Sequence, residues 1–574
     1  MALHLITPFL SSKPEIVATK ARISQRFNPV KCDSLPSANK WSIHVQRNPS
    51  ITWKSSEDVL SIDHAEKLKE LKHVLRNGNN ESSHQRMDMI DAMERLNIDH
   101  HFQEEIDEIL RKQYVITRTS GGGGSGRDLH EIALNFRLLR QHGHHVPAEV
   151  FDKFMDKDGK FNRKLCGNMK GMIDLYEASH LSTAGEDILD EAGQFSGQIL
   201  KERLANCFAS HEAKLLRSTL QHPCHKSLPM FTAREFFGNF HGMNGWLGSF
   251  KELAKMDFSL QQHLHHQEIL QISKWWMELG LGNELKYARN QPLKWYIWAL
   301  ACLPDPTLSE ERVELTKAIS FIYIIDDTFD VYGTLDELTL FTEAVSRWDI
   351  ADTQELPDYM KICFKALYNV TNEISSWIYQ KHGWNPKDSL RKTWESLCKA
   401  FLVEAEWFAS GHIPSSEEYL RNGIISSGVH IVLVHIFFLL GQRLTQQNAQ
   451  IIDGSPRIIS STATILRLWD DLGNAEDDNQ GDNNNDGSYV SCLLLEHQGL
   501  SSKGAREQVM SMISDAWKSL NQECLFGSTF PITFTRASLN LARMVPLMYS
   551  YDNKNSLPKL EEQVKSLLYY NVLM

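Results

Sequence analysis

The chain has 574 residues, a formal net charge of −12 and a sequence pI of about 6.1. This length allows two or more domains with large cores, and the acidic balance argues against nucleic acid as a partner. The nine cysteines are scattered, and neither they nor the histidines have the spacing of a metal site, so the sequence indicates reduced thiols and no zinc centre.

Residues 1–45 differ in composition from the rest of the chain. They contain six lysines and arginines but only two acidic residues, Glu15 and Asp33, together with several serines. Such a composition is typical of an organelle transit peptide, and a disordered tail is the alternative. A secretory signal is disfavoured because no basic residue precedes the apolar stretch from Ala2 to Leu10.

An N-terminal helical domain is predicted over residues 50–230. Amphipathic periodicity begins near Ser56, and no sustained β alternation follows. Helices are predicted around residues 65–71, 87–96, 102–110 and 128–143. The glycine-rich stretch 120–126 is predicted as a flexible loop, because it lacks the Gly-Lys-Ser/Thr ending of a phosphate-binding loop.

A second domain is predicted over residues 231–574, entered through the segment that begins at Leu228. Helix follows helix to the end of the chain, and we expect a bundle around an apolar cavity. The apolar stretch from Val429 to Leu440 is shorter than the roughly 18 residues of a membrane span. The expected fold is therefore all-α with two helical domains and no membrane span.

The first motif that indicates chemistry is an apolar run that ends in Asp326, Asp327 and Asp330. On an α-helix, Asp326 and Asp330 share a face, and two neighbouring carboxylates repel each other unless a cation lies between them. Carboxylate oxygens suit Mg²⁺ or Mn²⁺, and Mg²⁺ commonly bridges such groups to a substrate phosphate. The alternative is an ordinary solvated acidic helix end.

A second acidic ladder lies 144 residues further along the chain. Asp470, Asn474 and Asp478 follow one another at intervals of four, so a helix would place their oxygen ligands on one face. Arg467 precedes them by about one turn, and its guanidinium is suited to phosphate oxygens. Two facing helices of this kind can hold a metal cluster in the core of a bundle.

Both motifs carry a resemblance to a known family. Asp326-Asp327-x-x-Asp330 resembles the DDxxD motif of plant class I terpene synthases, and the segment from Asp470 to Asp478 resembles their second metal motif, (N/D)Dxx(S/T)xxxE. The resemblance runs from about residue 50 to the C-terminus. Asn474 replaces the usual Ser or Thr, and Asp478 replaces the usual Glu, which leaves the affinity of that metal position open.

The resemblance implies a C-terminal class I terpenoid synthase bundle that binds a prenyl diphosphate with three Mg²⁺ ions, or Mn²⁺. It places Arg289 and Arg467 on the diphosphate and Trp298 against the substrate carbocation, while Trp295 is expected in the core. The family pattern Arg-x-Arg reads Arg289-Asn290-Gln291 here, so its second arginine is missing. Without the resemblance, a surface position is the favoured interpretation of Arg289.

Two further segments have counterparts in the family. Residues 426–428, Ser-Ser-Gly, are predicted to interrupt a helix beside the cavity. Tyr549 and Asp552 resemble part of a late segment that closes over the second metal helix, although an ordinary polar turn is an equal alternative. The N-terminal domain has no DxDD motif, so it is predicted to have no chemistry of its own.

The segment from Lys40 to Trp53 lacks the tandem arginines that many plant monoterpene synthases carry near the mature N-terminus. The chain thus resembles the acyclic subfamily, most closely linalool and nerolidol synthases. We expect geranyl diphosphate to give linalool and farnesyl diphosphate to give nerolidol, in a monomeric plastid enzyme, or a cytoplasmic one if the tail is not a transit peptide. The alternatives are a prenyl-chain transferase, an ocimene- or farnesene-forming synthase, and a helical scaffold without catalysis.

Overall fold

A computed structural model of the chain is helical throughout the part that it describes, and no β-strand occurs in that part. An isolated antiparallel bridge joins Met155 and Phe161. The predicted all-α fold is therefore confirmed. The described residues are 53–77, 82–119, 128–207, 211–239, 245–474, 487–497, 499–549, 564–565 and 567–568.

Several predictions fall outside these ranges. The candidate transit peptide of residues 1–45, the glycine-rich stretch 120–126, and the site candidates Asp478 and Asp552 lie outside the described residues. Asn474 is described as the last residue of its helix but not in its side chain.

Two helices of the N-terminal part begin at side chains that cap their first turn. Asp128 caps α5 by accepting a hydrogen bond from the backbone N–H of Glu131 at 2.9 Å, and Ser82 caps α3 in the same way. The first helix begins at Trp53, slightly earlier than predicted. The helices are α2 (Trp53–Asn77), α3 (Ser83–Arg95), α4 (Gln103–Thr119), α5 (Leu129–Gln141), α6 (Met169–Ser179), α7 (Asp187–Asn206), α8 (His211–Gln221) and α9 (Pro229–Asn239).

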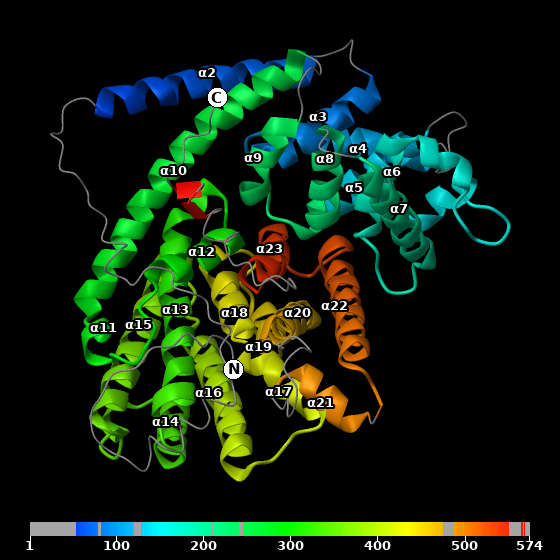
Figure 1. The fold of residues 1–574 in the computed structure, drawn as a ribbon. Coiled ribbons are helices and arrows are strands. Elements are labelled where there is room, and N and C mark those ends of the chain that lie inside the picture. Colours follow the sequence, from blue (N-terminus) through cyan, green and yellow to red (C-terminus); the bar gives the residue numbers. More distant parts are fainter. Residues whose placement is uncertain are drawn as a thin grey trace.

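The long helix α10 (Gly245–Leu279) connects the two hydrophobic cores of the described chain. Its first half contributes Leu247 and Phe250 to the smaller core, which the N-terminal helices build. Its second half contributes Ile272 and Trp276 to the larger core of the C-terminal bundle. In Figure 1, α10 runs from the upper group of helices down to the bundle, and α2 lies along its upper part.

The C-terminal part is a bundle whose helices surround one cavity. Helix α12 packs on α13 and α23, α13 on α18, and α20 on both α18 and α23. The helices are α11 (Leu281–Glu284), α12 (Pro292–Cys302), α13 (Ser309–Asp327), α14 (Leu335–Arg347), α15 (Asp358–His382), α16 (Lys387–Ser410), α17 (Ser416–Ser426), α18 (Val429–Leu440), α19 (Gln446–Asp453), α20 (Arg457–Asn474), α21 (Tyr489–Glu496), α22 (Ser502–Leu525) and α23 (Ile532–Met548).

A buried ion pair joins α10 to α13. The guanidinium of Arg312 donates two hydrogen bonds to the carboxylate of Glu268, at 2.6 and 3.0 Å, and a third to the carbonyl of Leu303 at 2.9 Å. Tyr296 donates its hydroxyl to the same carboxylate at 2.6 Å. The side chains of Arg312 and Glu268 are 0% and 2% exposed, so this polar network lies inside the bundle and fixes α10 and α12 against α13.

The prediction that the apolar stretch around Val429 is too short for a membrane span was wrong in one respect. Residues Ser416–Leu440, counted together, are long and apolar enough to cross a membrane. However, 83% of the most apolar 18-residue stretch within this segment is buried inside the protein, as in the core helix of a bundle. The segment is also divided, because α17 ends at Ser426 and α18 begins at Val429.

Candidate active site

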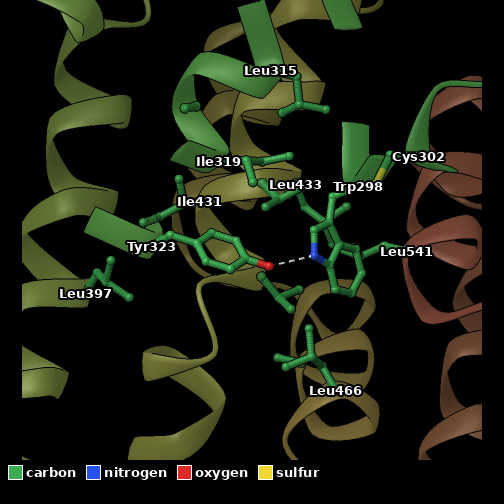
Figure 2. Packing of buried hydrophobic residues seen from close by; sticks show 14 of the residues in the cluster. Trp298, Cys302, Leu315, Ile319, Tyr323, Leu397, Ile431, Leu433, Leu466 and Leu541 are labelled. Atoms are coloured by element: carbon green, nitrogen blue, oxygen red, sulfur yellow. Dashed lines mark hydrogen bonds between the residues drawn. The ribbon is translucent and has the colours of Figure 1, made fainter. Parts of the chain in front are cut away.

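An apolar cavity of about 550 Å³, its open mouth included, lies within the ring of helices α12, α13, α18, α20 and α23. Its walls are mostly aliphatic and aromatic, which suits a hydrocarbon chain. Figure 2 shows Trp298 and Tyr323 side by side in this region, with the indole N–H donating to the Tyr323 hydroxyl at 2.9 Å. The lining residues are Trp298, Ile319, Ile322, Tyr323, Asp326, Phe401, Ser426, Ser427, Val429, Val432, Leu466, Leu541 and Tyr549.

The first acidic motif lies at the end of α13, but not on a single α-helical face. The α-helix ends at Asp327, and a π-helical turn, η7 (Thr328–Tyr332), follows. Asp326 and Asp327 are buried, whereas Asp330 lies in the turn and is exposed. Asp330 therefore lies in a wider, π-helical turn and not in a continuous α-helix, which is the part of the helix that the prediction did not anticipate. The two carboxylates nevertheless interact through their charges.

Arg289 binds the first two carboxylates of this motif. Its guanidinium forms ion pairs with Asp326 and, at 2.7 Å, with Asp327, and its backbone N–H donates to Asp327 at 2.6 Å. The guanidinium also lies over the ring of Tyr323, 5.0 Å from the ring centroid. Arg289 is thus part of the site and not the surface arginine of the alternative interpretation.

Burial and mutual repulsion make the first acidic motif costly to ionise. The pKa of Asp326 is raised to about 7, chiefly by burial and next by the charge of Asp330, against the opposing effect of Arg289. Burial also raises the pKa of Asp327, which the same arginine opposes. A further cation beside these carboxylates would favour their ionised form.

The second acidic motif lies on α20 and is almost completely buried. Asp470 and Arg467 are each 1% exposed, and the Arg467 Nη1 atom lies 3.6 Å from Asp470 Oδ2. Arg467 donates to the carbonyl of Gly423 at 3.3 Å and to the hydroxyl of Ser426 at 2.8 Å. Its Nη1 atom has no hydrogen-bond partner among the described residues. The structure therefore brings Arg467 and Asp470 together, as predicted from their spacing.

Asp471 has a structural role that the sequence did not indicate. It accepts a hydrogen bond from the hydroxyl of Tyr419 at 2.9 Å and another from the backbone N–H of Tyr489 at 3.2 Å. Burial raises the pKa of Asp471 to about 7, and Arg467 opposes this shift. Because Tyr419 precedes Asp471 by 52 residues, no local pattern could have revealed the contact.

Asp326 on α13 and Asp470 on α20 both lie near the same tyrosines at the cavity mouth. The charges of Asp326 and Asp470 both raise the pKa of Tyr549, after the larger effect of burial, and both act on Tyr323 as well. Tyr549 lies at the end of α23 and lines the cavity, with its ring 6.4 Å from that of Trp298. The aromatic lining and the acidic mouth thus belong to a single site.

The predicted helix break at residues 426–428 is confirmed, and it lies beside the cavity. Gly428 adopts a left-handed conformation, with φ of 73°, between α17 and α18. A Cβ atom at this position would lie 2.8 Å from Cγ2 of Ile322, which lines the cavity. Both the backbone angle and the close approach of Ile322 therefore require glycine.

The neighbourhood of Arg289 explains two residues of the incomplete Arg-x-Arg pattern. Asn290 accepts a hydrogen bond from the indole of Trp276 at 2.8 Å, which holds the segment against α10. Gln291 immediately precedes α12, whose first residue is Pro292, without making a side-chain capping hydrogen bond, and its buried side-chain oxygen has no hydrogen-bond partner among the described residues. Trp295 is fully buried and packs edge-on against Trp276, as predicted.

The residues at the mouth fit a hard divalent cation. Asp326 on α13 and Asp470 on α20 are both buried, and burial, followed by the charge of Asp330, raises the pKa of Asp326 to about 7. Oxygen donors of this kind suit Mg²⁺ or Mn²⁺ and not a soft metal. Arg289 and Arg467 supply positive charge on both sides of the same mouth.

Comparison with known proteins agrees with this geometry. Residues 277–519 match the model of the terpene synthase family, metal binding domain, and residues 40–222 match that of the terpene synthase, N-terminal domain. An (E)-nerolidol synthase of Cannabis sativa is 54% identical over 84% of this chain and 88% of its own length. The chloroplastic S-(+)-linalool synthase of Arabidopsis thaliana is 45% identical over 98% of this chain and 100% of its own.

A solved structure shares the whole architecture. Isoprene synthase from grey poplar leaves, in complex with three Mg²⁺ ions and dimethylallyl-S-thiolodiphosphate, superposes with a TM-score of 0.83. It is 34% identical, and the match covers 90% of this chain and 99% of that one. The chain therefore belongs to the terpene synthase family and is a metal-dependent lyase that acts on prenyl diphosphates.

Proposed function

We propose that this terpene synthase converts geranyl diphosphate to linalool and farnesyl diphosphate to nerolidol. The observation that carries the proposal is an apolar, aromatic cavity whose mouth bears buried carboxylates from two helices. Relatives named as nerolidol and linalool synthases support the choice of products. The bond between the terminal carbon and the diphosphate oxygen breaks, and its electron pair leaves with diphosphate. A water oxygen then bonds to the tertiary carbon of the allylic cation and releases one proton.

The proposed roles of the polar residues follow from their positions in the site or, for Asn474 and Asp478, from the second motif in the sequence. Asp326 and Asp330 on the first motif, with Asp470, Asn474 and Asp478 on the second, would hold Mg²⁺ or Mn²⁺. A metal held by these residues would neutralise the negative charge of the departing diphosphate. Arg289 and Arg467 bind diphosphate oxygens, and the buried Nη1 atom of Arg467 supports this role.

The aromatic residues are proposed to stabilise the cation. The face of Trp298 can stabilise a positive charge in the cavity by about 0.5–2 kcal/mol. Its indole N–H is occupied by Tyr323, which fixes the ring orientation. Tyr549 and Asp552 are proposed to close the mouth after substrate binds, which excludes bulk water while the cation exists.

The cavity is proposed to accept both chain lengths. Each additional buried CH₂ group contributes about 0.8 kcal/mol of binding free energy where space exists. A pocket that merely has room for the longer chain discriminates weakly against the shorter one. The compartment that holds the protein would then decide which alcohol is made.

Purified full-length protein with Mg²⁺ is expected to release diphosphate from both substrates and to form linalool and nerolidol, identified by chiral gas chromatography. Hydrocarbons such as ocimene or farnesene as the sole products would show that the allylic cation loses a proton instead of capturing water. Longer diphosphates formed only with added isopentenyl diphosphate would indicate a prenyl-chain transferase. No diphosphate release from a folded protein would indicate a scaffold without catalysis.

We also propose that residues 1–45 direct the protein to plastids, where geranyl diphosphate would be its substrate. The basic, serine-containing composition supports this, and several relatives carry the word chloroplastic in their names. A fusion of residues 1–50 to a fluorescent protein is expected to enter plastids. A purely cytosolic signal would contradict the proposal and favour farnesyl diphosphate as the substrate in the cell.

A further inference from the structure

Three histidines and one aspartate meet where α2 and the short helix η2 (Asp99–Phe102) pack on α10. The carboxylate of Asp257, on α10, lies 2.8 Å from His101 Nε2, 3.5 Å from His64 Nε2 and 3.8 Å from His100 Nε2. His64 belongs to α2, and the two consecutive histidines belong to η2. Residues from three separate segments therefore direct ring nitrogens at one buried carboxylate.

Three of these ligand atoms lie close enough together to hold a metal ion. The ligand atoms of His64, His101 and Asp257 all lie within 4.8 Å of one another. Tetrahedral zinc, with bonds of about 2.0–2.1 Å to nitrogen and oxygen, places its ligand atoms about 3.3–3.4 Å apart. Small side-chain adjustments would bring the observed distances to that value.

Among the described residues, two of the ring nitrogens have Asp257 as their ion-pair partner but make no hydrogen bond. The Nε2 atoms of His64 and His100 are buried and have no hydrogen-bond partner among the described residues. His64 is 9% exposed and Asp257 is 5% exposed, so water has little access to either. A buried polar atom that makes no hydrogen bond destabilises the folded protein. A ligand that accepts both nitrogen lone pairs would remove that cost.

Carboxylates beside the cluster favour a cation. Asp257 forms no ion pair with lysine or arginine in the part of the chain that the structure describes, and its other oxygen accepts a hydrogen bond from the amide of Gln261 at 2.6 Å. The charge of Asp99 also acts on His100. Gln261 thus serves as an outer partner that orients the carboxylate, as such partners do in metal sites.

A second histidine cluster provides a comparison within the same chain. His84, Asp88 and His130 also lie within metal-ligand distance of one another. However, the ammonium of Lys170 lies 3.3 Å from Asp88 and already supplies a positive charge there. This second cluster is therefore the poorer site for a cation.

We propose that His64, His100, His101 and Asp257 form a binding site for Zn²⁺, or for a transition metal of similar preference, separate from the site of the lyase reaction. Three imidazoles and one carboxylate suit zinc and disfavour Mg²⁺, which requires oxygen ligands. Four protein ligands would leave no open position, so the site is structural. It fastens α2 and η2 to the first half of α10.

The test uses full-length protein without a histidine tag, stripped of metal with a chelator and kept in excess Mg²⁺ so that the acidic motifs are saturated. Co²⁺ is added as a spectroscopic probe and then displaced by Zn²⁺. We expect about one Zn²⁺ per chain and the intense visible absorption of tetrahedral Co²⁺. Zinc should also raise the unfolding midpoint of the wild-type protein, since a ligand that binds only the folded state stabilises it.

The deciding variant is His64→Gln. Because His64 Nε2 makes no hydrogen bond, this change removes a ligand without breaking the pair between His101 and Asp257. Zinc affinity should fall at least about tenfold, and the shift in the unfolding midpoint should disappear. The matched control, His84→Gln in the second cluster, should leave both quantities unchanged.

Two results would overturn the proposal. Unchanged zinc affinity in His64→Gln would place the metal elsewhere, for instance on cysteine thiols. Failure of the wild-type protein to retain zinc would show that the four residues form only a hydrogen-bonded network.

Discussion

Asp326→Asn is expected to lower kcat/KM for geranyl diphosphate by about a thousandfold or more, which corresponds to about 4 kcal/mol of transition-state stabilisation. The carboxylate is buried at the cavity mouth, where the proposed metal and Arg289 meet. The substitution keeps the size of the side chain and removes its charge, so the helix end should fold as before. Steady-state kinetics at several Mg²⁺ concentrations measure the loss of kcat/KM. Circular dichroism checks that the variant folds as the wild-type protein does.

A matched control for this substitution is Asp336→Asn. Asp336 also lies at a helix end close in sequence, in the first turn of α14, but it is exposed and does not line the cavity. Its variant should keep wild-type kinetics within about twofold, as is usual for surface changes. Wild-type turnover by a folded Asp326→Asn variant would show that this carboxylate is not a metal ligand.

Arg312→Met is expected to destabilise the folded protein by about 3–5 kcal/mol, because it leaves the buried carboxylate of Glu268 without its partner. The carbonyl of Leu303 would lose its donor as well. The shift in the midpoint of urea unfolding, followed by circular dichroism, measures the loss. Adding Glu268→Leu to the variant should recover part of it, because the unpaired buried charge is then removed.

The matched control is Arg421→Met, which breaks an ion pair of the same chemistry on the surface. Arg421 lies 2.6 Å from Glu417, the same distance as in the buried pair, but the two side chains are 69% and 83% exposed. Solvent screens such pairs, so the loss should stay below about 1 kcal/mol. Equal shifts for the two variants would show that burial of Arg312 has no special importance.

The parts of the molecule that follow from local patterns could be predicted. Helix periodicity and the helix break at residues 426–428 depend on residues close in sequence, and the structure confirms them. The spacing of Arg467 and Asp470 is likewise a property of one helix, α20. The hypothesis that two acidic helices face one site came from the pair of ladders, and the family resemblance strengthened it.

The parts that depend on tertiary contacts could not be predicted. The π-helical turn that carries Asp330 departs from simple α-helical counting, and nothing in the sequence around it signals the wider turn. The anchoring of Asp471 by Tyr419 depends on the packing of α17 against α20. The histidine cluster was missed for the same reason, because His64 and Asp257 are 193 residues apart and only the fold brings them together.

The ion pairs of Arg289 have a thermodynamic consequence for how the site assembles. The guanidinium occupies an oxygen of Asp326, so it competes for that oxygen with any cation that enters the mouth. A diphosphate that draws Arg289 toward itself frees the carboxylate, and metal binding to the carboxylate frees the arginine for phosphate. If Asp326 binds the proposed metal and Arg289 binds the diphosphate, linkage requires each event to favour the other by the same factor, so we expect metal and substrate to bind cooperatively.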